Sequence, residues 1–327
     1  MKVAVPIIST NEAELLRHAL STALMQEDVE VVVFDNASTD ATAATAAELG
    51  VRCVRLEERH SYCRAMNVAL GSVDADAILF MQPDCFLEPG FVAAARARLE
   101  DPHVGSVAPK LIRAVGPNAD QRLGLIDAAG MVVDRRRKNG LIGHGRDSSA
   151  FNTPAEAFGA DGAVALYRRA TLDDLVVENQ VFDEDLVSVR DGVPADWGSD
   201  ADLAWRARLL GWRCVYEPRA VAYHVRRYSP SKRAQIARWQ RTVQFRNRYL
   251  MIIKNDPLSA FLRDLMWILP YEIAALGFAL LREPFLLRGY REAIALYSGM
   301  RRKRVELQRR RKVRGSPQIP YALRPPT

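Results

Sequence analysis

The chain has 327 residues, of which 49% are hydrophobic and 26% charged, an ordinary globular composition with enough length to bury a full core. Its formal net charge of +7 is concentrated in residues 301–314, which carry nine basic residues and one acidic residue. The other residues sum to −1. This balance argues against a domain whose surface is built to bind nucleic acid, so no nucleic-acid partner is expected.

Cysteine usage and the N-terminus indicate where the protein works. Cys53, Cys63, Cys85 and Cys214 form no CxxC pair and have no disulfide-like spacing, as is typical of free thiols in a reducing cytosol. No signal-peptide pattern precedes the first strand-like run, so we expect a protein that starts in the cytoplasm.

Residues 1–113 alternate strand-like and helix-like runs, which predicts a doubly wound α/β layer that binds a nucleotide. The apolar run 31–34 is typical of a parallel strand that is covered on both faces. The expected strands are residues 2–9, 29–35, 51–55 and 77–82, and the expected helices are residues 12–26, 39–49, 61–71 and 89–100.

Residues 114–160 have a weaker periodicity, and it returns in the strand-like run 161–167. The basic run 135–140 is typical of a solvated turn between short strands, and Gly211 is a suitable residue to end a helix. The other expected elements are a helix from about residue 169, a helix over 200–210, and strand-like runs at 214–216 and 220–223 that end at His224.

Residues 258–287 are apolar but interrupted by Pro270 and Glu272, and their longest charge-free run of nine residues is well short of the ~20 that span a bilayer. They predict helices that either lie in the plane of a membrane interface or pack on the rest of the chain. The basic residues 301–314 favour the membrane surface, because each Lys or Arg near an anionic leaflet adds about 1 kcal/mol to binding. We therefore expect a peripheral protein on the inner face of the cell membrane.

Asp84 is a lone carboxylate that follows an apolar run beginning at Ile78. In an open α/β sheet, ligands bind at the carboxyl ends of the strands, so this carboxylate is expected to face a site. It can hold a divalent cation, and that cation can hold a diphosphate. The alternative is that Asp84 only starts a turn.

Carboxylates also follow other predicted elements. Asp35 ends the second strand and can accept a hydrogen bond from a base or a ribose hydroxyl, whereas capping of the next helix explains Ser38 and Thr39. Asp200 and Asp202 lie in the first turn of a helix, where carboxylates offset the helix dipole. Asp202 is expected to do little more, and Asp200 to point into a cleft as a general base.

His224 ends a strand and suits an Mn-like ion beside a carboxylate, although a surface or structural role is the alternative. Arg226 and Arg227 can hold a leaving diphosphate through forked hydrogen bonds, or they can simply solvate a loop.

With these residues in order, the chain resembles the family 2 inverting glycosyltransferases of the GT-A fold, especially the bacterial rhamnosyltransferase-like members. The resemblance covers about residues 1–230, and the order and spacing of its motifs carry it. These motifs are residues 6–12, 33–40, 80–84, 126–130, 159–169, 182–185 and 199–203, followed by His224.

The resemblance implies a hexosyltransferase in which Asp84 and His224 hold Mn²⁺ or Mg²⁺, Asp200 is the general base, and the donor is a dTDP- or UDP-sugar. The residues that it places around the donor are Pro6, Asn11, Glu12, Asp35, Asn36, Asn67, Asp84, Arg226 and Arg227. The chain departs from the family where Gln82 replaces the first acid of the DxD motif and where Ser199 replaces the Glu before the base.

The predicted organisation is a GT-A domain over residues 1–230, then a helical extension over 231–300 and a basic tail over 301–327. The domain divides into a nucleotide-sugar half (1–113) and an acceptor half (114–230). Because the extension and tail would hold the site near a membrane, the expected acceptor is a lipid-linked or cell-envelope glycan.

Other classes of protein remain as alternatives. A Rossmann oxidoreductase would need G-x-G-x-x-G after the first strand, and Ser9-Thr10-Asn11-Glu12 is not that motif. A nucleotidyltransferase would share the alternating pattern. The remaining alternative is a catalytically degenerate protein that binds membrane or nucleic acid through its basic tail.

Overall fold

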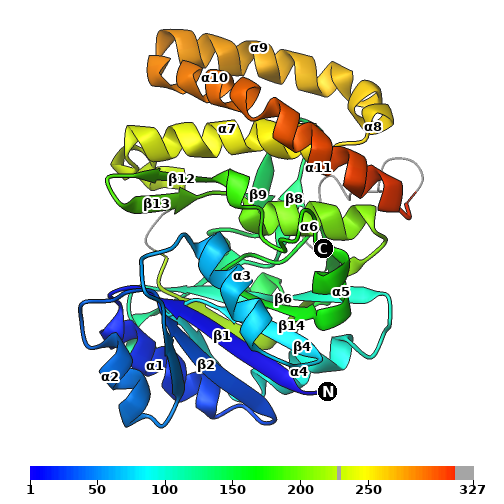
Figure 1. Ribbon diagram of the computed structural model, residues 1–327. Coiled ribbons are helices and arrows are strands. Elements are labelled where there is room, and N and C mark those ends of the chain that lie inside the picture. Colours follow the sequence, from blue (N-terminus) through cyan, green and yellow to red (C-terminus); the bar gives the residue numbers. More distant parts are fainter. Residues whose placement is uncertain (227–229, 314–327) are drawn as a thin grey trace.

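The structure is a computed structural model that describes residues 1–226 and 230–313 (Figure 1). The strands are β1 (Val3–Ser9), β2 (Val29–Asp35), β3 (Arg52–Arg55), β4 (Ala77–Met81), β5 (Cys85–Leu87), β6 (Val104–Ala114), β7 (Arg122–Ala128), β8 (Met131–Val133), β9 (Asn139–Leu141), β10 (Ala155–Ala157), β11 (Val164–Arg168), β12 (Val187–Arg190), β13 (Val193–Asp196) and β14 (Arg213–His224). The helices are α1 (Ala13–Leu24), α2 (Thr42–Glu48), α3 (Tyr62–Ser72), α4 (Phe91–Arg98), α5 (Arg169–Asp174), α6 (Ser199–Leu209), α7 (Arg238–Asn255), α8 (Leu258–Arg263), α9 (Leu265–Leu281), α10 (Leu287–Ala295) and α11 (Tyr297–Arg310).

Across the described residues, ten strands form one mixed sheet in the order β10-β14-β6-β11-β4-β1-β2-β3, with β5 beside β14 and β7 beside β6. The predicted nucleotide-binding half, β1 to β4, is parallel. Strand β11 enters antiparallel between β4 and β6, and β14 runs parallel to β6. This order brings the carboxyl ends of β1, β2 and β4 to one edge of the sheet, where ligands bind in open α/β folds.

The sheet has a hydrophobic core on each face, because successive residues of a strand point to opposite sides. In β1, Val5 and Ile7 pack into the core beneath α1 and α4, whereas Ala4 and Ile8 pack into the core beneath α3 and α6. A strand that is covered on both sides must be apolar throughout, and the short strands of residues 1–113 were predictable for that reason.

Helix α6, which carries the predicted base, lies between two glycines with positive φ, Gly198 (84°) and Gly211 (89°). Most residues are strained in this left-handed conformation, whereas glycine is not. A Cβ on Gly198 would also come within 3.0 Å of the Met251 side chain of α7. The start of α6 and helix α7 are therefore in close contact.

The C-terminal helices α7 to α11 form a layer on top of α6 and the small hairpins β8–β9 and β12–β13 (Figure 1). Leu250 and Met251 of α7, Ala293 of α10, and Met300 and Leu307 of α11 all belong to the core beneath α3 and α6. The segment predicted as an extension therefore completes the core of the predicted GT-A domain.

One prediction about basic residues is wrong and another holds only in part. Residues 301–310, expected in a basic tail, belong to α11, in which Lys303 is buried; residues 314–327 lie outside the described part of the chain. The run 135–140 does connect two short strands, but Arg137 is buried and forms ion pairs with Asp256 (2.7 Å) and Asp264 (2.9 Å). In both cases, acids distant in sequence compensate the buried charge.

Within the described residues, no single helix combines the length and apolar character needed to cross a membrane. The pair Leu265–Leu281 and Pro284–Ala295 meets that criterion only when taken together, and it is bent by 118°.

Candidate active site

Asp35 ends β2 and Asn36 follows it, at the edge of the sheet where ligands bind in such folds. The Asp35 carboxylate is buried, and its Oδ1 accepts a hydrogen bond from the Ser38 N–H at 2.9 Å. Asn36 donates from Nδ2 to the His60 carbonyl at 3.0 Å and accepts from the His60 N–H at 2.8 Å. Asn36 therefore fixes the loop before α3, and both Asn36 and His60 line the cavity described below.

The loop after β1 carries the predicted donor residues Asn11 and Glu12. Asn11 has φ 55°, and its Oδ1 accepts from the Thr39 N–H at 2.7 Å, while its own N–H donates to Ser38 Oγ at 3.1 Å. Ser38 and Thr39 thus connect two loops, and the prediction that they cap the next helix is wrong. Glu12 lines the cavity.

Pro6 and Asn67 lie behind the cavity wall. Pro6 is buried within β1 beside Val32 of β2. The Asn67 side chain of α3 donates to the Phe182 carbonyl (2.9 Å) and to Glu184 Oε1 (3.1 Å), and it accepts from the Phe182 N–H (2.8 Å). In this structure Asn67 holds the acidic loop at residues 182–185 against α3.

Asp84 and His224 lie side by side, because β5 pairs with the end of β14 directly after Asp84. The His224 Nε2 and Asp84 Oδ1 atoms are 3.7 Å apart, and Cys85 completes a group whose ligand atoms all lie within 4.8 Å of one another. An ion with bonds of about 2.1 Å can bridge ligand atoms up to about 4.2 Å apart, so the Asp–His pair fits one divalent cation. Burial raises the pKa of the Cys85 thiol well above its usual range, which makes the thiol a poor ligand.

Asp127, at the end of β7, orients this pair, although no role was predicted for it. Its Oδ2 lies 2.8 Å from His224 Nδ1, which leaves Nε2 directed to the Asp84 side, and carboxylates commonly orient metal-binding histidines in this way. Burial opposes ionisation, but hydrogen bonds from His224 and Arg226 outweigh it and lower the pKa of Asp127 to about 2. The two side chains that can hold the ion, Asp84 and His224, are therefore already oriented for binding.

Arg226 extends this network toward the predicted base. Its Nε lies 2.6 Å from Asp127 Oδ1, and its Nη2 lies 3.0 Å from Asp161 Oδ2. The guanidinium predicted to hold a diphosphate is thus shared between two carboxylates in this structure. Arg227, the other predicted diphosphate ligand, lies outside the described residues.

Asp200 occupies the first turn of α6, at the cavity wall. Its Oδ1 accepts from the Ala201 N–H at 2.7 Å and its Oδ2 from the Gly162 N–H at 3.2 Å. Burial, followed by the nearby negative charge of Asp161, raises the pKa of Asp200 to about 6. A carboxylate with this pKa is well suited to act as a general base near neutral pH.

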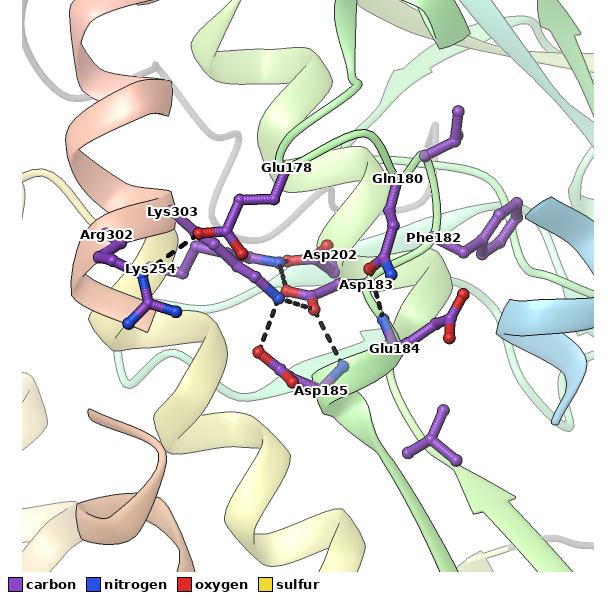
Figure 2. Close-up of polar contacts among 12 residues, drawn as sticks. Glu178, Gln180, Phe182, Asp183, Glu184, Asp185, Asp202, Lys254, Arg302 and Lys303 are labelled. Atoms are coloured by element: carbon purple, nitrogen blue, oxygen red, sulfur yellow. Dashed lines mark hydrogen bonds and ion pairs between the residues drawn. The ribbon is translucent and has the colours of Figure 1, made fainter. Parts of the chain in front are cut away.

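Asp202, two residues further along α6, has a different role from the one predicted. It is fully buried, with its Oδ1 2.8 Å from Lys254 Nζ and its Oδ2 2.8 Å from Arg206 Nη2. Figure 2 shows Lys254 of α7 and Lys303 of α11 among Asp202, Asp183 and Asp185. The prediction that Asp202 mainly offsets the helix dipole is wrong, because this carboxylate anchors α6 to the C-terminal helices.

A cavity of about 1230 Å³ lies between these groups and the C-terminal helices. One end is lined by Asn36, Gln82, Asp161, Asp200 and Arg226, and the other by residues of α7 and α9. Typical ligand pockets measure about 300–1,000 Å³, so this cavity has room for a donor and part of an acceptor together.

This fold and site define a GT-A glycosyltransferase: a doubly wound sheet carries an Asp–His pair that fits a divalent cation, and a half-buried carboxylate on α6 lines one large cavity. The sequence model described as Glycosyl transferase family 2 matches residues 4–176, more than half of the chain, and the protein belongs to that family. A search of the curated proteins found no match.

Solved structures support the same fold. A mannosyltransferase from Pyrobaculum calidifontis, PcManGT, solved with GDP-Man and Mn²⁺, is 21% identical over 94% of this chain and 84% of its own, with a TM-score of 0.53. TarS 1–349 of S. aureus, solved with UDP-GlcNAc, is 17% identical over 94% of this chain and 90% of its own, with a TM-score of 0.58. GalNAc-T7, solved with UDP, GalNAc and Mn²⁺, is 12% identical over 78% of this chain and 48% of its own, with a TM-score of 0.58. The predicted family, GT-A fold and glycosyltransferase class are confirmed.

Proposed function

We propose that the protein transfers a hexose, rhamnose or another, from a nucleotide diphosphate to a hydroxyl group of a lipid-linked or cell-envelope glycan, with inversion at the anomeric carbon. The observation that carries this proposal is Asp200, a cavity-lining carboxylate whose pKa of about 6 suits proton abstraction.

In the proposed step, the acceptor oxygen attacks the anomeric carbon while Asp200 takes the hydroxyl proton. The bond between that carbon and the diphosphate oxygen breaks, and its electron pair leaves with the diphosphate. Because this is a single displacement from the opposite face, the configuration inverts. The Gly162 and Ala201 N–H groups hold the Asp200 carboxylate in place during the transfer.

Asp84 through its carboxylate and His224 through Nε2 would hold Mn²⁺ or Mg²⁺, and such an ion, when bound, offsets the negative charge of the leaving diphosphate. Asp127 keeps the His224 ring in the required orientation. The donor nucleotide is proposed to be dTDP or UDP, and the presence of GDP-Man in PcManGT makes GDP-sugars a necessary third group to test.

The exposed surface of α9 supports a location at the inner face of a membrane, where the apolar side chains enter the lipid interface and nearby arginines meet anionic headgroups. Met266 is 72% exposed, Ile273 65% and Leu281 84%, and an exposed apolar surface of this kind is typical of a face that contacts a membrane or another protein. A membrane location would bring the cavity to a lipid-linked acceptor.

The test is release of nucleotide diphosphate from GDP-, UDP- and dTDP-sugars, with Mn²⁺ or with a chelator, for the wild type, Asp200→Asn and the exposed control Asp120→Asn. We expect metal-dependent release from one donor that is lost in Asp200→Asn and kept in Asp120→Asn. The anomeric configuration of the product, measured by NMR, tests inversion. Wild-type rates in Asp200→Asn, or a product of retained configuration, would refute the mechanism.

A further inference from the structure

The far end of the cavity is built from two helix faces. Helix α7 contributes Arg241, Gln244, Phe245 and Arg248, a spacing of three, four and seven residues that places them on one side of the helix. Helix α9 contributes its own stripe with the same spacing, consisting of Tyr271, Ala274, Ala275 and Phe278. One wall of this end is therefore cationic and the other is aromatic and apolar.

The basic side chains of the cationic wall outnumber the acidic side chains that pair with them. Arg233 and Arg241 share the single carboxylate of Glu283, and Arg248 pairs with Glu272 at 2.6 Å. Lys138, at the tip of the β8–β9 hairpin, also lines this end of the cavity, and no described acid pairs with its ammonium group. Four bases thus face two acids, an excess that favours an anion.

Two of these arginines also have hydrogen-bonding capacity to spare. Arg241 Nε and Arg248 Nη1 are buried and have no acceptor among the described residues. Buried donors without an acceptor are unfavourable by about 1–3 kcal/mol each, so a small shift of either guanidinium toward a bound anion would be favourable. The Arg248 guanidinium is held in place by stacking on Tyr271, 4.8 Å from the ring centroid.

Helix α9 separates this cavity from the exposed apolar surface. Its cavity stripe begins at Tyr271, whereas Leu269, Ile273 and Leu280 face outward and are 54%, 65% and 54% exposed. A helix that is apolar on all sides is typically buried in protein or in lipid. At this end, the basic side chains could therefore bind the charged head of a ligand, and the apolar helix α9 could pack along the hydrocarbon chain of that ligand.

We propose that the α7–α9 end of the cavity is a binding site for the phosphate or diphosphate group of an amphiphile, with Arg241, Arg248 and Lys138 as its ligands. The proposal rests on the proposed function, because it assigns the charged group of a lipid-linked acceptor to a place in the same cavity as the base. It predicts an acceptor whose phosphate lies at α7 while its sugar hydroxyl reaches Asp200.

The test uses farnesyl diphosphate below its critical micelle concentration as the probe, and its binding is measured by calorimetry with Mn²⁺ and saturating UDP, GDP or dTDP present. We expect binding in the nucleotide-saturated protein that weakens about tenfold or more in Arg248→Gln and in Lys138→Gln. The matched control is Arg52→Gln, an exposed arginine on β3 that does not line the cavity. Lys138 is exposed, so its substitution keeps the test valid if Arg248→Gln fails to fold.

Farnesol and inorganic diphosphate identify which part of the probe is recognised, and both are expected to bind more weakly than farnesyl diphosphate. Dihexanoyl phosphatidylglycerol distinguishes the phosphate of a lipid-linked acceptor from that of a membrane headgroup. If it binds with the same dependence on Arg248, the site is assigned to a membrane headgroup. Displacement of the probe by nucleotide, or equal weakening in Arg52→Gln, would overturn the proposal. A protein that releases no nucleotide diphosphate from any donor would refute the proposed function, while this binding result would stand separately.

Discussion

The buried lysine of α11 offers a sharp test of how the C-terminal helices support the site. Lys303 is 4% exposed, and its Nζ contacts Asp183 Oδ1 and lies 2.7 Å from Asp185 Oδ2. Asp183 is also paired with Lys254, which in turn pairs with Asp202 of α6, the helix that carries the proposed base (Figure 2). The perturbation is Lys303→Met, which keeps the length of the side chain and removes its charge.

The expected loss of unfolding free energy follows from these contacts. Removal of one partner from a fully buried ion pair costs about 3–5 kcal/mol. The loss here is reduced because Asp183 keeps Lys254 and the Asp185 side chain is 40% exposed, so we expect about 2–3 kcal/mol. With an unfolding entropy of about 2.1 cal/mol/K per residue, a chain of this length loses about 1.5 °C per kcal/mol, or about 3–5 °C in all.

The assay is thermal unfolding of Lys303→Met beside Arg309→Met, an exposed position on the same helix. Burial opposes the ionisation of Asp183, but Lys254 and Lys303 outweigh it and lower its pKa, so this stability is present at neutral pH and is lost as the pH falls through the lowered value. The deficit of Lys303→Met should therefore persist at neutral pH and shrink only in strong acid. Equal unfolding temperatures for the two variants at neutral pH would refute the reasoning.

Further predictions concern the base, the metal pair and the outer helix. The rate of nucleotide diphosphate release should rise with pH through about 6 as Asp200 loses its proton, and Asp200→Asn should remove this limb and lower kcat about 10²- to 10⁴-fold; an unchanged pH profile would exclude this base. Asp127→Asn should weaken Mn²⁺ binding about 10- to 100-fold in calorimetry, because His224 loses its orienting carboxylate, and an unchanged affinity would contradict that role. Leu269→Gln combined with Ile273→Gln should lower sedimentation with anionic vesicles about tenfold or more without lowering the unfolding temperature, and undiminished sedimentation would place the membrane contact elsewhere.

The N-terminal half of the fold was predictable because its signals are local. Each expected strand over residues 1–82 differs by at most one residue at either end from the observed β1 to β4, since buried parallel strands are short apolar runs. The pairing of β6 with β14 was not predictable, because the two strands are about a hundred residues apart in sequence. Strand β14 was expected as two separate runs. The structure has one continuous strand, whose register with β6 shifts between Glu217 and Val221.

The sequence predicted part of the candidate site. The residues that it did not reveal share one property, which is that their partners are distant in the sequence. Asp84, His224 and Asp200 each lie at or next to the end of an element, and that position is visible in the sequence. Asp127 and Asp161 act through His224 and Arg226, which are 65 to 99 residues away, so only the folded chain reveals their roles. The same is true of Lys303, whose partners precede it by 118 and 120 residues.

The first turn of α6 holds two carboxylates with different roles: Asp200 is the proposed base, and Asp202 stabilises the fold. Burial raises the pKa of Asp200, and the negative charge of Asp161 raises it further, so its charged form is unfavourable in the folded protein. Burial acts in the same direction on Asp202, but Lys254 and Arg206 outweigh it and lower the pKa of this carboxylate. Two carboxylates in one helical turn thus have opposite shifts, because Lys254 and Arg206 outweigh burial at Asp202, whereas Arg226 does not outweigh burial and Asp161 at Asp200. Since α7 supplies Lys254, the C-terminal helices help to hold the helix that carries the proposed base.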